Sequence, residues 1–287
     1  MDNWDDLRFL VALSRTGTMT AAAKMLGTNT ATVSRRIERL SETLGEPAFV
    51  KTAHGWKPST SVARLIDLAQ TFDGELQTAL NSREPSEGSQ QVPVNIGCPP
   101  FVTSQVLIPN MSTETETLSV IGLTFNDRLL REGLGEHDIV VQLGTPDSGR
   151  VVTRKAGSIL FNMFTKRGSS AETNRWIGLS EMFDQAPVMT MGRDMFDTQP
   201  AVRVENFAAI FSLIHVTAMH GPLPEIMAAA SSELEYSKPG TEPFEAEFWI
   251  MFHETRRSDP VIRRVVDWIM DAFVNLDELQ RRHLKNG

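Results

Sequence analysis

The sequence predicts an α/β protein with a small helical N-terminal domain, one long helix and a C-terminal part built from two α/β lobes. Three observations predict this fold class. Residues 18–44 show helical spacing interrupted by a turn, and residues 59–80 keep a helical apolar period. Strand-like runs alternate with helical runs after residue 91. The chain of 287 residues is long enough for two domains or more.

Charge is distributed unevenly along the chain. The formal net charge is −8, yet residues 15–57 hold seven Lys and Arg against three Glu, which leaves −12 on the remainder. An acidic chain with one basic segment is compatible with nucleic-acid binding by that segment alone. The single cysteine, Cys98, excludes a disulfide framework and a multi-cysteine zinc site. MDNWDDLRFL does not resemble a signal peptide and no run is apolar enough to span a membrane, so we expect a cytoplasmic protein without a membrane partner.

Residues 18–40, TMTAAAKMLGTNTATVSRRIERL, predict two helices joined by a tight turn. Three consecutive alanines favour the first helix and permit close backbone approach, and Gly27 suits the left-handed residue that ends it. Thr28 or Asn29 then caps the second helix. Apolar residues at helical spacing predict one buried stripe on that helix. The stripe consists of Val33, Ile37, Leu40 and Leu44.

The opposite face of the second helix carries short polar side chains and an arginine. Arg35 points away from the stripe, and Thr32 and Ser34 flank it. Such a face fits a DNA major groove, because small residues permit close approach and hydroxyl and guanidinium groups hydrogen-bond base edges. The alternative is an ordinary solvated helix face. The following PAFVKTAHGWKPST favours DNA binding, because it predicts a hairpin with Lys51 and Lys57 on its arms, as in a wing along a phosphate backbone.

These residues resemble the winged helix-turn-helix of LysR-type transcriptional regulators. The resemblance is carried by LRFLVALSRTGTMTAAAKMLGTNTATVSRRIERLSETLGEPAFVKT, with Ala-Ala, Leu-Gly and Val-Ser at the positions typical of that family. It implies a winged helix-turn-helix DNA-binding domain over residues 1–58, with DNA contacts from the recognition helix and from the wing tip. The implied contacts are Asn29, Thr30, Thr32, Ser34, Arg35 and Arg36, with His54 at the wing tip. The family often has Gln-Pro where this chain has Thr30-Ala31, so no base preference is carried over.

Residues 59–91 are the predicted linker. Apolar residues at helical spacing predict a long helix, and the polar NSREPSEGSQQ that follows marks a hinge. One alternative is that this helix packs only on its own domain. The resemblance implies instead that it pairs with its counterpart in a second subunit, giving a dimer or a tetramer with two recognition helices on two half-sites. The apolar positions are Val62, Ile66, Ala69, Phe72, Leu76 and Leu80.

Residues 92–287 predict an effector-binding domain of two lobes. The strand-like runs VPVNIGCPP, LSVIGLTF and HDIVVQLG, with helical NDRLLREGL before the last, form one set, and a similar set follows. A lone closing helix begins at Pro260, capped by Asp259, so the chain crosses between the lobes twice. Lobe I then spans about residues 92–157 and 255–287, and lobe II about 158–254. This part resembles the effector-binding half of the same family, whose lobes are similar to periplasmic solute-binding proteins.

Two loops are candidates for contacting a ligand, because ligands of open α/β sheets bind beyond the carboxyl ends of strands and near helix N-termini. In CPPFVTSQ, the candidates are Pro100, Phe101, Thr103 and Ser104, and the resemblance implies a hydroxyl contact from Thr103 or Ser104. In VRVENF, either Glu205 or Asn206 begins a helix, and Asn206 is the candidate contact. The alternative is that these polar residues only cap their helices. Cys98 is either a redox sensor or, more typically, a small packed hydrophobe.

The sequence therefore predicts a sequence-specific regulator that binds double-stranded DNA and is modulated by a small-molecule effector held between the two lobes. No nucleophile, metal or phosphate-loop motif predicts an enzyme, a metal site or a cofactor. The alternative is a small-molecule (solute) binding protein without specific DNA regulation. The basic N-terminal segment and the missing export signal argue against it.

Overall fold

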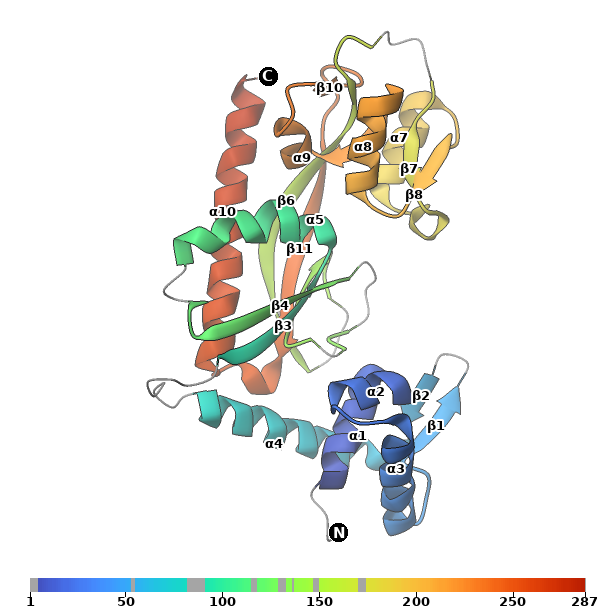
Figure 1. Ribbon diagram of the computed structural model, residues 1–287, viewed down its shortest axis with the longest axis vertical. Helices are drawn as coiled ribbons and strands as arrows, with labels where there is room; N and C mark the ends of the chain where they lie inside the picture. The colour runs from blue at the N-terminus through green and yellow to red at the C-terminus, as the bar shows by residue number, and fades with distance from the viewer. Residues whose placement is uncertain are drawn as a thin grey trace.

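The computed structural model describes residues 5–52, 55–81, 91–114, 118–128, 133–135, 137–146, 150–169 and 174–286. Helices α1–α4 form one end of the molecule, and a larger α/β domain forms the rest (Figure 1). The N- and C-termini lie at opposite ends. Within the described ranges, no helix is both long and apolar enough to cross a membrane. His54, most of the predicted hinge and residues 129–132 of the predicted NDRLLREGL helix lie outside these ranges.

The N-terminal domain is a winged helix-turn-helix. Its elements are α1 (Asp5–Thr16), α2 (Met19–Met25), α3 (Thr30–Leu44), β1 (Phe49–Thr52) and β2 (Gly55–Pro58). Gly27 adopts φ +63° after α2, as predicted, and Asn29 rather than Thr28 caps α3. Val33, Ile37 and Leu40 are buried, whereas Leu44 is 38% exposed, because the helix passes beyond the domain core before Gly45 ends it at φ +76°.

A turn, η1 (Thr60–Val62), leads into the linker helix α4 (Ala63–Asn81). The apolar stripe predicted for this helix is divided between two environments. Its N-terminal part, Val62, Ile66 and Ala69, is buried in the described chain. Its C-terminal part is exposed and continues a row begun by Leu68. The exposed row consists of Leu68, Phe72, Leu76 and Leu80, at 60%, 55%, 44% and 44%.

The C-terminal domain contains a seven-stranded mixed sheet in the order β10-β6-β11-β5-β3-β4, with β9 pairing β6, and a separate parallel pair, β7-β8. The strands are β3 (Val92–Cys98), β4 (Ile121–Asp127), β5 (Ile139–Leu143), β6 (Val151–Lys166), β7 (Ile177–Leu179), β8 (Val202–Val204), β9 (Gly221–Pro224), β10 (Leu234–Tyr236) and β11 (Phe244–His253). The helices and helical turns are α5 (Pro100–Val102), η2 (Thr103–Leu107), η3 (Ile108–Glu114), η4 (Glu181–Phe183), α7 (Pro187–Phe196), α8 (Phe207–Thr217), α9 (Glu225–Ala229), η5 (Glu254–Arg256) and α10 (Pro260–Asn286).

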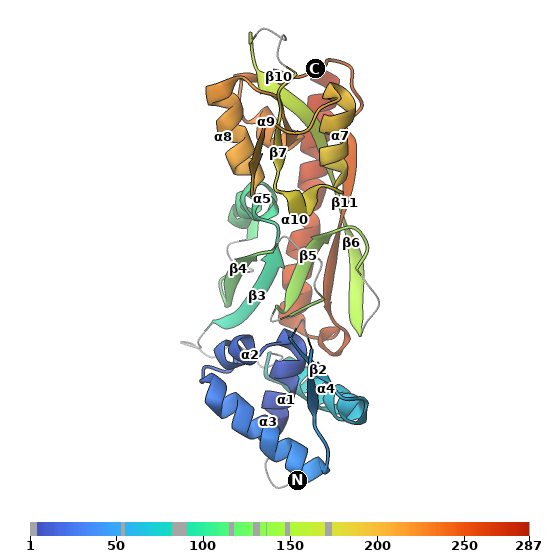
Figure 2. The ribbon, with the colours of Figure 1, turned by 90° about the vertical axis from the view of Figure 1, so that its right-hand side faces the viewer.

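Two long strands connect the two parts of this sheet. Strand β6 has 16 residues and pairs antiparallel with β11, from Phe244 opposite Phe161 to His253 opposite Val151. Both strands run from the group of β3, β4 and β5 to the group of β7, β9 and β10 (Figures 1 and 2). They are the two crossings predicted from the sequence. The predicted lobe boundary at residues 157 and 158 falls inside β6, which begins at Val151.

The closing helix α10 runs along both groups of strands (Figure 2). Asp259 is fully buried and caps it, because its Oδ1 accepts hydrogen bonds from the backbone N–H of Val261 at 2.9 Å and of Ile262 at 3.4 Å. The helical spacing of apolar residues in DPVIRRVVDWIMDAFVNL predicts a buried stripe with either Ala272 or Phe273 at one position, and the structure buries both. The buried residues are Val261, Val265, Ile269, Ala272, Phe273 and Leu276.

Candidate DNA-binding surface and ligand cleft

The N-terminal turn of α3 is exposed and is the candidate surface for contacting DNA. The Asn29 Oδ1 accepts hydrogen bonds from the Thr32 backbone N–H at 2.8 Å and from the Thr32 hydroxyl at 3.0 Å. Thr30 and Arg35 are exposed, and the Arg35 side chain has no ion pair within the described residues. Positive helix-dipole charge at this end favours a phosphate, and the exposed guanidinium is available to a base edge. Ser34 differs, because its hydroxyl donates to Glu38 Oε1 at 2.8 Å.

Arg36 faces the inside of its own domain. Its Nη1 donates to Asp6 Oδ1 at 3.1 Å, and its guanidinium carbon lies 5.5 Å from the centre of the Phe9 ring. Arg39 also binds Asp6, through Nε to Oδ2 at 2.9 Å and through a second hydrogen bond from Nη2. Burial opposes ionisation of Asp6, but the hydrogen bonds from Arg39 and Arg36 outweigh it and lower the pKa of this carboxyl. The Arg36 side chain therefore connects α3 to α1 through Asp6. That Arg36 also contacts DNA remains a prediction.

The wing places its two lysines on opposite faces. In the β1-β2 hairpin, Lys51 is opposite Trp56 and Lys57 is opposite Val50, and successive pairs alternate between faces. Trp56 packs against the domain core, and its backbone N–H donates to the Gly17 carbonyl at 2.7 Å. Lys57 shares the outward face with the exposed Val50. Both lysines are exposed, but Lys57 is the one on the outward face.

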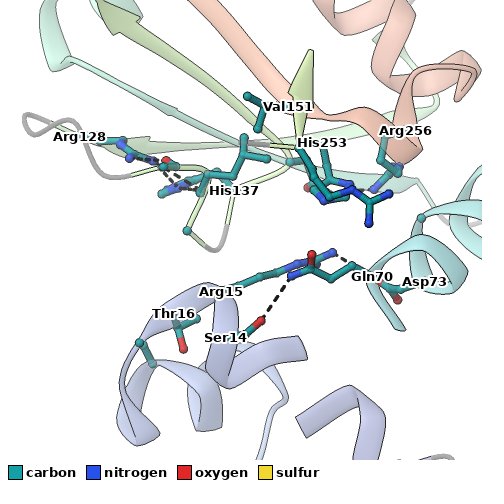
Figure 3. Close-up of a pocket in the computed structure, with 18 of the residues that line it drawn as sticks. Ser14, Arg15, Thr16, Gln70, Asp73, Arg128, His137, Val151, His253 and Arg256 are labelled. Atoms are coloured by element: carbon teal, nitrogen blue, oxygen red, sulfur yellow. Dashed lines mark hydrogen bonds and ion pairs between the residues drawn. The ribbon is translucent and has the colours of Figure 1, made fainter. Parts of the chain in front are cut away.

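A polar cavity of about 940 Å³ separates the N-terminal domain from the C-terminal domain. Figure 3 shows Ser14, Arg15 and Thr16 of α1 below it, Gln70 and Asp73 of α4 beside it, and residues of the C-terminal domain above it. Arg15 pairs with Asp73 at 3.3 Å, and Gln70 donates to the Ser14 hydroxyl at 3.3 Å. These contacts hold α1 against α4, and the facing wall contains His137, His253 and Arg256.

Helix α4 also contacts the C-terminal domain directly. Asn81 Nδ2 donates to Asp259 Oδ2 at 3.0 Å, and Arg150 lies 3.6 Å from Asp67. At Gly74 the helix packs tightly on η5, because a Cβ at this position would lie 1.9 Å from the Thr255 hydroxyl oxygen. Helix α4 therefore contacts both the helix-turn-helix and η5, the turn that follows β11.

An apolar cleft of about 380 Å³ lies between the two lobes. Phe101 lies at its centre, with edge-on ring contacts at centroid distances of 5.2 Å to Phe207, 5.8 Å to Phe161 and 5.9 Å to Phe248. Four of the five predicted ligand contacts line this cleft. They are Pro100, Phe101, Ser104 and Asn206.

Two of the five candidates, Thr103 and Asn206, already make polar contacts within the chain. Thr103 does not line the cleft, because its hydroxyl lies 2.8 Å from Cys98 Sγ. Asn206 is the cap of α8, accepting from the Ala209 backbone N–H at 2.9 Å, so its Oδ1 is already engaged. Burial raises the pKa of the fully buried Cys98 thiol to about 11, more than the Thr103 hydrogen bond lowers it. Cys98 is therefore a packed core thiol rather than a reactive thiolate.

The sequence interpretation missed the aromatic residues contributed by the crossing strands. Phe161 lies on β6, and Phe244 and Phe248 lie on β11. All three side chains line the cleft. A signal for Phe161 and Phe248 was present in the aromatic-rich runs SILFNMFTK and EFWIMFHE, but only the pairing of β6 with β11 brings these residues to the loop around Phe101. Among the described residues, no group of three or more His, Cys, Asp and Glu is placed to hold a metal ion.

A winged helix-turn-helix joined by a long helix to a two-lobed α/β domain with an inter-lobe cleft defines a DNA-binding protein with a ligand-binding domain. Residues 4–61 match the family model described as "Bacterial regulatory helix-turn-helix protein, lysR family". The chain is 24% identical to the Mau operon transcriptional activator of Paracoccus denitrificans over 281 residues, which cover 94% of this chain and 96% of that protein. It is 30% identical to the regulator AbaB of Streptomyces antibioticus over 146 residues, 49% of this chain and 48% of that protein.

Solved structures with the same fold include a full-length variant of OxyR from Pseudomonas aeruginosa, with a TM-score of 0.63 and 15% identity, covering 95% of this chain and 98% of that one. ArgP from Mycobacterium tuberculosis has a TM-score of 0.61 and 14% identity, with the same coverage. The helix-turn-helix of this chain is of the LysR type, as the sequence predicts, and nearly the full length of the chain is similar to a transcriptional activator. The relatives are described as regulators rather than enzymes, and they give no support to the solute-binding alternative.

Proposed function

We propose that this chain binds a specific duplex DNA site as a dimer, and that a small molecule in the inter-lobe cleft changes the arrangement of the two DNA-binding domains. The observation that carries the proposal is that α4 contacts both the helix-turn-helix and the turn η5 of the effector domain. Arg35, Thr30 and Lys57 supply the DNA contacts from exposed positions. The domain boundaries that we propose are residues 58 and 91, and the proposed place of action is the cytoplasm.

Dimerisation is supported by the exposed row on α4. Leu68, Phe72, Leu76 and Leu80 follow one another at intervals of four residues, so they share one face of the helix. A continuous exposed apolar face marks an interaction surface, and a counterpart helix from a second copy fits it by length and pattern. Two recognition helices would then address two half-sites. A Leu76→Glu variant, compared with wild type by sedimentation, should shift the protein toward the monomer.

Regulation requires a ligand that distinguishes two arrangements. A molecule that binds both arrangements equally tightly cannot shift their populations. The related Paracoccus protein is named as a transcriptional activator of an operon. We propose the same general role here, control of transcription at a DNA site, with the regulated genes to be found by binding.

The test is binding to the DNA immediately upstream of the coding sequence, compared with a random duplex of equal length across a salt series. A preference for the upstream DNA that persists at physiological salt supports the proposal. Equal, weak and steeply salt-dependent binding to every candidate DNA, including sites selected from a random library, would contradict it.

Two variants separate base contacts from phosphate contacts in this assay. Arg35→Ala should weaken specific binding by about 1–3 kcal/mol with little change in salt slope, whereas Lys57→Ala should flatten the slope by about one unit or less. Lys238→Ala removes an exposed lysine from the effector domain and is the matched control. Equal effects of Arg35→Ala on specific and random DNA would remove Arg35 from base recognition.

A further inference from the structure

The side chains that line the inter-lobe cleft have an unusual charge balance. Six phenylalanines surround it, and two carboxylates, Asp127 and Glu205, lie at its edge. The lining contains no Lys, Arg or His among the residues that the structure describes. The six aromatic residues are Phe101, Phe161, Phe183, Phe207, Phe244 and Phe248.

The two carboxylates come from facing sides of the cleft. Asp127 ends β4 in the first lobe, and Glu205 follows β8 in the second. Both side chains are exposed, and neither has an ion pair within the described part of the chain. The Glu205 carboxylate accepts one hydrogen bond, from the Ser180 hydroxyl at 3.1 Å.

The arginines adjacent in sequence to these carboxylates are engaged elsewhere. Arg128 donates to the carbonyls of Gly133 and Leu134, away from the cleft lining. Arg203, on β8, pairs with Asp184 at 2.7 Å. Both carboxylates therefore contribute negative charge to the cleft that no described arginine neutralises directly.

An anionic ligand would be disfavoured in this environment. Moving a carboxylate from water into an apolar cavity is costly unless a partner compensates, and two like charges at the rim add repulsion. The N-terminus of α8 points positive dipole charge toward this region, which favours an anion. However, the Asn206 side chain already accepts from the Ala209 N–H, and Glu205 lies directly before it. The negative charge of Glu205 therefore opposes the helix dipole at that helix end.

A cationic head on an apolar body matches all of these features. Ammonium groups are attracted to the faces of aromatic rings and to carboxylates, and the apolar body gains by burial against phenylalanine. We propose that the cleft selects an organic cation, an amine carrying a small apolar group, over the corresponding carboxylate. This inference rests on the proposed function, because it assumes that the cleft is the effector site.

The test uses matched ligands that differ only in charge. Benzylamine, benzyl alcohol and benzoate form one set, and 2-phenylethylamine, 2-phenylethanol and phenylacetate form a second. Binding to the full-length protein is measured at pH 7 by calorimetry. The amine of at least one set should bind about tenfold or more tightly than its carboxylate, with the alcohol between them.

Variants locate the preference. Glu205→Gln and Asp127→Asn should each lower the affinity for the amine to that for the alcohol. Ala208→Trp, at an exposed position of the lining, should block binding of both the amine and the alcohol. Glu233→Gln changes an exposed carboxylate outside the lining and should leave amine binding unchanged.

Three results would overturn the inference: equal or tighter binding of the carboxylates, no binding of any member of either set, or amine binding that survives Glu205→Gln, Asp127→Asn and Ala208→Trp. DNA preference measured without ligand is independent of these results. A protein that selects its DNA site but prefers carboxylates would retain the proposed function and lose only the inference about charge.

Discussion

Replacing Gly74 with alanine should uncouple the linker helix from the effector domain. The added Cβ would lie 1.9 Å from Thr255 Oγ1 and 2.5 Å from Thr255 Cβ. Restoring ordinary contact with the hydroxyl, at 3.4 Å or more, requires the helix and η5 to separate by about 1.5 Å. We expect this overpacking to cost about 1–3 kcal/mol at the contact. Alanine also improves the helix itself by about 1 kcal/mol, so α4 should remain folded while it leaves η5.

The assay is DNA binding with and without ligand, together with thermal unfolding of each domain. Gly74→Ala should leave DNA affinity without ligand within about threefold of wild type and should reduce the change in affinity that ligand produces. Thr255→Gly in the same chain removes the side chain that clashes and should restore part of the response. Thr255→Ala alone is the control for the lost hydrogen bond between Thr255 and His253 at 2.8 Å. A full ligand response in Gly74→Ala would refute coupling through this contact.

Two further predictions concern buried titratable groups. Asp6→Asn should destabilise the N-terminal domain by about 1–2 kcal/mol at pH 7, because Arg36 and Arg39 lose a charged partner that is 6% exposed. The folded-state pKa of Asp6 lies below the ordinary value of 3.8, so this stabilisation is complete above about pH 4 and disappears as the pH falls further. Urea unfolding from pH 7 to pH 2 should show the stabilities of the wild type and Asp6→Asn converging below about pH 4, and a constant difference over this range would contradict the ion-pair assignment. Cys98, with a pKa of about 11, should react with iodoacetamide at pH 8 only at the rate of unfolding, and rapid labelling of the native protein would show that the thiol is accessible.

Local chemistry made much of the helix-turn-helix and of α10 predictable. Gly27, the Asn29 cap and the buried stripe of α10 depend on residues within one or two turns of each other, so periodicity and capping rules were sufficient. The ion pair of Asp6 with Arg36 joins residues 30 positions apart and was not predictable from spacing. The divided stripe of α4 was missed for another reason: its buried and exposed halves show the same helical spacing of apolar residues, so spacing alone does not tell them apart.

The sequence predicts the cleft residues that lie in loops but not those that lie on the strands β6 and β11. Pro100, Phe101 and Asn206 follow strand ends, where general rules for α/β sheets place ligands. Phe161 and Phe248 reach the same cleft only because β6 and β11 pair across the two lobes, and that register includes a shift between Phe248 and Trp249. Thr103 does not line the cleft because its hydroxyl contacts the Cys98 thiol instead. The positions of strands and loops in the sequence do not predict this side-chain contact.

The path from the cleft to the DNA-binding domain follows a single strand. Phe244 and Phe248 line the cleft from β11, the strand ends at His253, and Thr255 of the next turn touches α4 at Gly74. A ligand that shifts Phe248 by displacing Phe101 therefore acts on the strand whose end supports the linker helix. Such a shift changes DNA binding only if the contact between η5 and α4 differs between the two arrangements, because equal contacts would leave their populations unchanged. Substitutions at the contact between Gly74 and Thr255 should therefore reduce the effect of ligand on DNA affinity.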